Sequence, residues 1–172
     1  MTQNHRQIFR LSFISTASQV VLPPTWELLE RLQSAAHWDE ASIHPAKRDF
    51  PRVHISWHQG AGFNVHCFEN EVSLGKFLVT GLEFSPPRIE INLGGQALER
   101  WPRELFVSEL LATDALEHFL ERGELKPLLS WIGTGQFPRE TIWQGREERE
   151  AWQRTNRGWG NVVPTQLICG NG

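Results

Sequence analysis

The chain has 172 residues, a formal net charge of −3 and an isoelectric point near 6.2. This length predicts a single domain, residues 1–172, that buries about two-thirds of its unfolded surface without disulfides or metals. The sequence lacks the concentrated basic stripe typical of nucleic-acid-binding proteins, and no apolar run approaches the roughly 20 residues of a membrane helix. The two cysteines form neither a zinc-binding spacing nor a disulfide framework. We therefore expect a cytoplasmic protein that binds neither nucleic acid nor a membrane.

The first fifty residues predict one strand and one helix. The strand is expected near residues 7–15, where apolar and polar side chains alternate. After two prolines, Thr25 is expected to cap a helix that runs from Trp26 to about Ala36. Residues 38–50 are predicted to form a loop.

Residues 52–69 carry the clearest pattern in the chain, because apolar side chains alternate there with polar ones on both sides of a Gly-Ala-Gly sequence. This pattern predicts a β-hairpin with one apolar face and one histidine-rich face. If Gly60 to Gly62 form the loop, Ser56 lies opposite His66. The same register pairs Trp57 with Val65 and Ile55 with Cys67.

The remaining elements complete an α+β fold. Strands are expected at residues 75–82 and 88–93, and the longest helix at 102–122 with Gly123 as its C-terminal stop. We predict an antiparallel sheet of about five strands with helices packed on one face. The charged C-terminal region is expected to add a short helix at 147–154 and an edge strand at 162–168.

The histidine-rich face of the hairpin is the first place to look for chemistry. A serine opposite a histidine suggests a hydrolase, but the sequence has no GxSxG elbow and no obvious carboxylate to orient His66. His54, His58 and His66 share this face, yet positions 54 and 58 are separated by about 13 Å along a strand and cannot bind one ion together. We therefore predict no catalytic residue, no metal ligand and no cofactor-binding residue.

Two surfaces are candidates for binding a protein partner. The first is the polar face of the sheet with its adjoining strand, and the second is a C-terminal segment rich in tryptophan and arginine, the side chains most enriched at interface hot spots. The first comprises His54, His58, Asn64, His66, Arg88, Glu90 and Asn92. The second comprises Trp131, Gln136, Arg139, Trp143, Arg146 and Arg149.

Two passages resemble a known class of proteins. The sequence IEINLGG followed by PRELFVSELLATDALEHFL, from Ile89 to Leu120, and the segment FPRETIW are similar to parts of the small cytoplasmic immunity proteins of bacterial polymorphic toxin and type VI secretion systems. The resemblance implies a non-enzymatic inhibitor that binds a cognate toxin domain and needs no cofactor.

Two alternatives remain open. An enzyme or small-ligand-binding protein would place a pocket above the histidine-rich face, with His66 or His58 as a general base. A self-assembling subunit would instead use its tryptophans at a symmetric homodimer interface.

Overall fold

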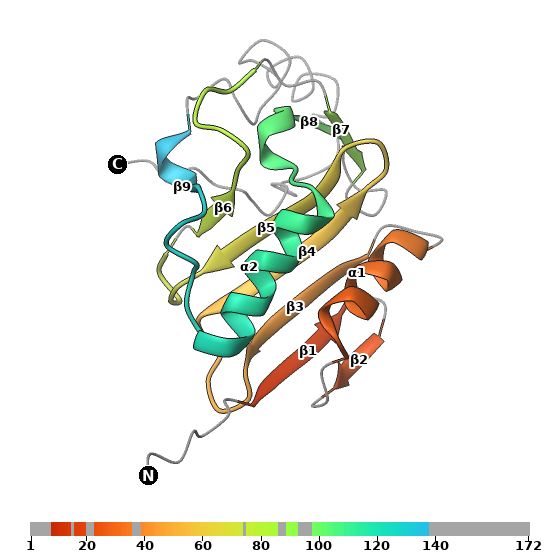
Figure 1. Ribbon diagram of the computed structural model, residues 1–172, viewed down its shortest axis with the longest axis vertical. Helices are drawn as coiled ribbons and strands as arrows, with labels where there is room; N and C mark the ends of the chain where they lie inside the picture. Colours follow the sequence, from red (N-terminus) through yellow and green to blue (C-terminus); the bar gives the residue numbers. More distant parts are fainter. Residues whose placement is uncertain are drawn as a thin grey trace, which may run out of the picture.

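The computed structural model describes residues 8–14, 16–19, 23–35, 39–73, 75–85, 89–92 and 98–137. Two helices pack against one face of a seven-stranded antiparallel sheet with strand order β2-β1-β3-β4-β5-β6-β9 (Figure 1). This arrangement confirms the predicted α+β fold with helices on one face, and the sheet is larger than the five strands expected. The helix and strand predicted after residue 146 lie outside the described residues.

Seven strands and two helices make up the main body of the fold. The large sheet contains β1 (Phe9–Phe13), β2 (Thr16–Gln19), β3 (Glu40–Pro45), β4 (Arg52–His58), β5 (Gly62–Phe68), β6 (Lys76–Leu78) and β9 (Trp131–Gly133). The helices are α1 (Thr25–Ser34) and α2 (Glu109–Arg122), with single 3-10 turns at η1 (Arg103–Leu105) and η2 (Thr134–Gln136). A separate two-stranded sheet pairs β7 (Ile89–Asn92) with β8 (Leu98–Trp101).

The main core lies between the helices and the sheet. It receives every second side chain of β1, β3, β4 and β5, together with the apolar stripes of α1 and α2. Leu29, Ile55 and Phe63 are fully buried there, and burial of such a side chain stabilises the fold by about 1.5–3 kcal/mol. The alternation predicted near residues 7–15 is confirmed, since Phe9, Leu11 and Phe13 all lie in this core.

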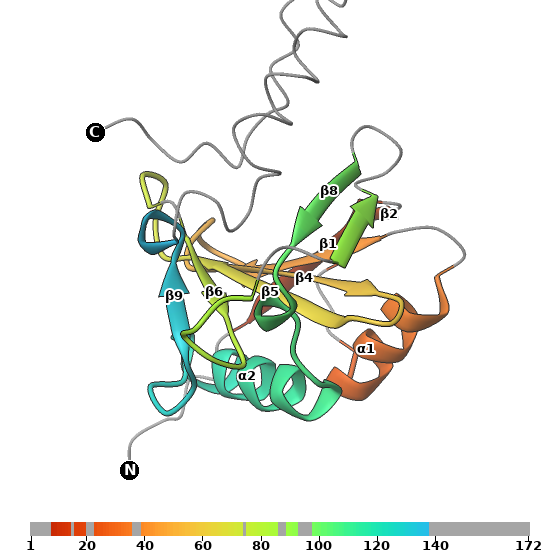
Figure 2. The ribbon, with the colours of Figure 1, turned by 90° about the horizontal axis from the view of Figure 1, so that it is seen from above.

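A second apolar cluster lies on the opposite face of the sheet. It contains Phe77 of β6, Ile91 of β7, Trp101 of β8 and Phe106, which follows η1. Figure 2 shows β7 and β8 on the side of the sheet opposite α1 and α2. One end of the sheet is therefore covered on both faces.

The predicted loop at residues 38–50 is wrong, because Glu40–Pro45 form β3 between β1 and β4. Ala41, Ile43 and Pro45 of this strand are buried, but an alanine and a proline give a weak strand signal in sequence. Thr25 is the first residue of α1 and not its cap; Pro24 occupies the cap position.

The predicted helix at 102–122 begins later than expected. Residues 103–105 form η1, and Val107 is extended and pairs with Phe63 of β5. Ser108 then caps α2 by accepting a hydrogen bond from the Leu111 backbone nitrogen. Gly123 ends the helix in the left-handed conformation, with φ of 72°, as predicted.

The hairpin forms with a different register from the one predicted. Ser56 lies opposite Asn64, and His54 lies opposite His66. The register differs by two positions because Gly62 is already part of β5 and pairs with His58. The loop is thus shorter, and Gly60 within it has a positive φ, of 76°. In the described part of the chain, no helix is long and apolar enough to span a membrane.

Candidate functional site: the open half of the sheet

The histidine-rich face of the sheet is divided into a covered half and an open half. Over β5, β6 and the end of β4, the second apolar cluster buries His58, Asn64 and His66, which are 9%, 7% and 7% exposed. The expectation that these three side chains form an exposed surface is therefore wrong. Strand periodicity predicts correctly that they point away from the helices, but it carries no information about a second layer above them.

Each of these buried side chains has structural contacts. Asn64 Nδ2 donates a hydrogen bond of 2.9 Å to the Leu105 carbonyl oxygen. The His66 ring stacks on Phe77 with centroids 3.9 Å apart and an interplanar angle of 13°. The His58 and Phe106 rings pack in a T-shaped arrangement with centroids 5.2 Å apart. The Asn64 and His58 contacts join the sheet to the segment Leu105–Phe106 that covers it, whereas the His66–Phe77 stack lies between the paired strands β5 and β6.

The serine–histidine pair expected from the sequence is not formed as predicted. Ser56 Oγ shares a hydrogen bond of 3.0 Å with His58 Nε2 instead of facing His66. Burial lowers the pKa of His58 from 6.5 to about 4, and the negative charge of Glu40 opposes part of that shift. A buried ring with this pKa is neutral at physiological pH.

The open half lies over β1, β3 and β4, beyond the second apolar cluster. Strand pairing brings its polar side chains into rows across the sheet. In one such row Ser12 lies opposite Ser42, and Ser42 lies opposite His54. All its members are half-buried except Arg10, which is exposed. The open half comprises Arg10, Ser12, Glu40, Ser42, His44, Arg52 and His54.

A carboxylate–imidazole pair occupies the centre of the open half. His54 Nδ1 lies 2.6 Å from Glu40 Oε1, and the two side chains are 24% and 27% exposed. Because a carboxylate only accepts hydrogen bonds, Nδ1 carries the proton, and in the neutral ring Nε2 holds the lone pair. The hairpin pattern in the sequence indicates His54 but not Glu40, which lies in the stretch predicted as a loop.

The other predicted site residues lie apart from the open half. Glu90 forms an exposed ion pair of 3.3 Å with Arg100, and the backbone of Asn92 pairs with Leu98 at the end of β7. Trp131 is half-buried and its Nε1 donates to the Lys126 carbonyl oxygen at 3.2 Å. The remaining predicted residues, Arg88, Arg139, Trp143, Arg146 and Arg149, lie outside the described residues.

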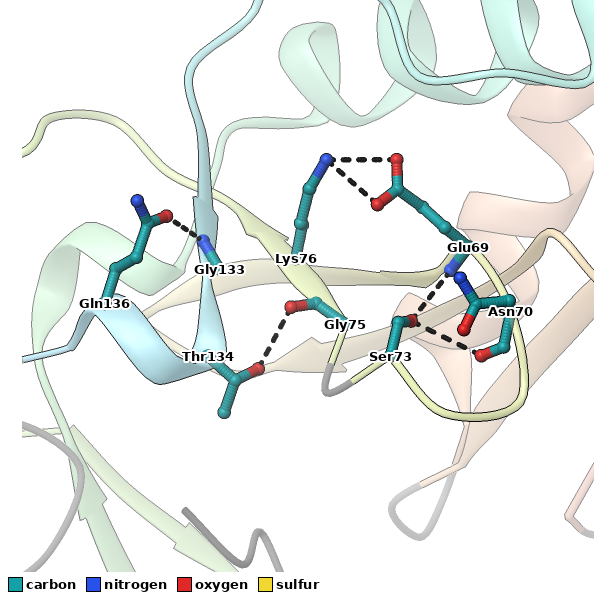
Figure 3. Close-up of polar contacts among 8 residues, drawn as sticks. All are labelled: Glu69, Asn70, Ser73, Gly75, Lys76, Gly133, Thr134 and Gln136. Carbon is teal, nitrogen blue, oxygen red and sulfur yellow. Dashed lines mark hydrogen bonds and ion pairs between the residues drawn. The ribbon is translucent and has the colours of Figure 1, made fainter. Parts of the chain in front are cut away.

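Gln136 belongs to a local network that holds the turn after β5 against β9 (Figure 3). Its Oε1 accepts a hydrogen bond of 2.8 Å from the Gly133 nitrogen. Thr134 Oγ1 donates to the Gly75 carbonyl oxygen at 3.2 Å, and Lys76 pairs with Glu69 at 2.9 Å. The bond to Gly133 gives Gln136 a local structural role at the end of β9.

The described residues contain no group of three histidine, cysteine, aspartate or glutamate side chains that could hold a metal ion. Cys67 is buried on the helix side of β5. Burial, with a further contribution from Glu69, raises the pKa of its thiol to about 12 against the opposing charge of Lys76. Cys67 is therefore a protonated core side chain and not a nucleophile.

Comparisons with known protein families and with curated proteins find no match for this chain.

Proposed function

We propose that this chain is a non-enzymatic immunity protein that binds a cognate bacterial toxin domain in the cytoplasm, without a cofactor. The observation that carries the proposal is the open half of the sheet. It is a polar surface on three adjacent strands, and the neighbouring part of that face, over β5, β6 and the end of β4, is covered by the second apolar cluster. The resemblance to immunity proteins supports the choice of a toxin as partner.

The geometry of the open half suits a protein partner. Neighbouring strands lie about 4.8 Å apart, so side chains in register form a shallow array on a rigid support. The pair formed by Glu40 and His54 is already about three-quarters buried. A partner that closes over this pair would remove its remaining contact with water. Fully desolvated side chains are the ones that contribute most to affinity at an interface.

The tryptophan- and arginine-rich C-terminal segment is the second contact region in this proposal. Trp131, at its start, is anchored to the fold by its hydrogen bond to Lys126.

A rescue assay tests the proposal. The gene immediately upstream of this one is expressed in a host cell with and without this chain, and growth is measured. We expect the upstream product to arrest growth and this chain to restore it, with weaker rescue by His54→Ala. The proposal would be contradicted if the upstream product were a harmless metabolic enzyme.

The Glu40–His54 pair favours a second candidate function, a hydrolase or small-ligand-binding protein. In that function His54 would be the general base, oriented by Glu40, because His58 and His66 are buried. Hydrolysis of a p-nitrophenyl ester is the direct assay, and His54→Ala should abolish any rate above that of free imidazole. An unchanged rate in that variant would eliminate this candidate.

A further inference from the structure

We propose that one end of the open half is a basic docking patch for an acidic surface on the partner protein. This inference rests on the proposed function and deepens it by naming the chemistry of the partner. The patch comprises Arg10, His44, Lys47, Arg48 and Arg52.

Strand register brings the patch together from three separate segments. Arg10 of β1 lies opposite His44 of β3. On its other side, β3 pairs with β4, and Ile43 lies opposite Val53. Because the two strands are antiparallel, His44 is then flanked by Arg52 of β4. Lys47 and Arg48 occupy the turn that follows β3 and are both exposed. No sequence pattern indicates the patch, because its members are dispersed along the chain.

Hydrogen bonds fix the backbone beneath the patch. His44 Nδ1 lies 3.0 Å from the Arg48 carbonyl oxygen and 3.1 Å from that of Pro45, so it is the donor to both. Arg52 Nε donates to the Asp49 carbonyl oxygen at 3.3 Å. The turn is thus tied to both strands, and a partner meets cations on an ordered support, which lowers the entropic cost of association.

The patch carries charge that the described part of the fold leaves unneutralised. Among the described residues, the one acidic side chain paired with it is Asp49, 3.8 Å from Arg52 and 74% exposed. The three arginines and the lysine of the patch carry four formal positive charges, and the Asp49 carboxylate carries one negative charge. The local formal charge is therefore +3, opposite in sign to the net −3 of the whole chain.

Most basic residues elsewhere in the described part of the chain have an acidic partner, and the exposed Arg103 donates instead to the Phe106 carbonyl oxygen at 3.0 Å. Four of them have an acidic partner within 4 Å, whereas Arg10, Lys47 and Arg48 have no ion pair among the residues that the structure describes. The four are Lys76, Arg100, Arg122 and Lys126. Unneutralised cations at one corner raise the on-rate and set the orientation of an acidic partner.

An acidic protein surface fits this patch better than a nucleic acid does. Affinity for a polyphosphate backbone grows with the number of phosphates that lysine and arginine neutralise, and this patch offers four such side chains. The net negative charge of the rest of the chain would also repel an extended polyanion. Clustered carboxylates on a folded partner match the size and sign of the patch.

Binding of a fluorescein-labelled hexaglutamate peptide, followed by fluorescence anisotropy, tests the inference. The triple variant Arg10→Ala, Lys47→Ala, Arg48→Ala removes three charges from the patch. The matched control Lys76→Ala, Arg100→Ala, Arg122→Ala removes three elsewhere. We expect about a tenfold or greater loss of affinity in the first variant, less than about twofold in the control, and weaker binding as salt rises.

Three results would overturn the inference: no binding of the peptide to the unmodified protein, equal losses in the two variants, or tighter binding of a single-stranded oligonucleotide than of the peptide. Thermal melting curves of both variants serve as the control for folding. Because the probe is a peptide and not the toxin, these results are independent of whether the upstream gene product forms a complex.

Discussion

His58 lies between the sheet and Phe106, where burial lowers the pKa of its ring to about 4. The unfolded ring has its ordinary pKa of 6.5 and binds a proton that the folded ring does not bind. Above pH 6.5, the contribution of His58 to the free energy of unfolding should therefore not change with pH. It should fall by up to about 3 kcal/mol as the pH is lowered from 6.5 to 4.

Urea unfolding at a series of pH values measures this dependence. The variant His58→Gln retains a hydrogen-bonding partner for Ser56 but does not titrate, so its stability should decline less between pH 6.5 and 4. Parallel pH profiles for the two proteins would show that His58 does not carry the effect.

Cys67 should be inert to thiol reagents in the folded protein. Its side chain is fully buried and the pKa of its thiol is raised to about 12. In a Cys169→Ser background, we expect an aromatic disulfide reagent to modify Cys67 only after addition of denaturant. Rapid modification of the native protein would contradict this burial.

At the scale of elements, the contact between Gly62 and Val107 holds the start of β5 against the segment before α2. A side chain at Gly62 would place Cβ 2.5 Å from the Val107 carbonyl oxygen, and φ at this position is +121°. Phe63 and Val107 exchange backbone hydrogen bonds of 3.0 and 2.8 Å directly beside it. Glycine is therefore required for the close approach of these two backbones.

Gly62→Ala should destabilise the protein more than Gly60→Ala. Gly60 also has a positive φ, of +76°, but a Cβ at that position would have no atom within 4 Å. Alanine at Gly60 should cost about 1 kcal/mol, and alanine at Gly62 about 2 kcal/mol or more because a backbone must also move. Denaturant unfolding of both variants gives the comparison, and equal losses would argue against the contact.

Sequence patterns predict the faces of elements better than their pairing or extent. The alternation in residues 52–69 identifies correctly which side chains of β4 and β5 face the helices, because the pleat has a period of two. The predicted register is wrong because register depends on which residues form the turn. β3 escapes prediction because Ala41 and Pro45 resemble loop residues until neighbouring strands bury them.

At the scale of the whole molecule, the candidate site is a product of topology. The sequence pattern indicates His54 but not Glu40 or Ser42, which become its neighbours only through the pairing of β3 and β4. Arg10 joins the same face through the pairing of β1 with β3. The same pattern places His58 and His66 in an exposed surface, because a second layer built from β7, β8 and Phe106 leaves no signal in β4 and β5.

Binding of a toxin domain by the open half of the sheet is tested most directly by isothermal titration of this chain with the product of the upstream gene. His54→Ala is compared with Glu117→Ala, an exposed control on α2 at the opposite face. We predict a one-to-one complex. Its binding free energy should be weakened by about 2 kcal/mol or more in His54→Ala and unchanged in the control. Absence of a complex, or equal affinities for both variants, would contradict this role of the open half.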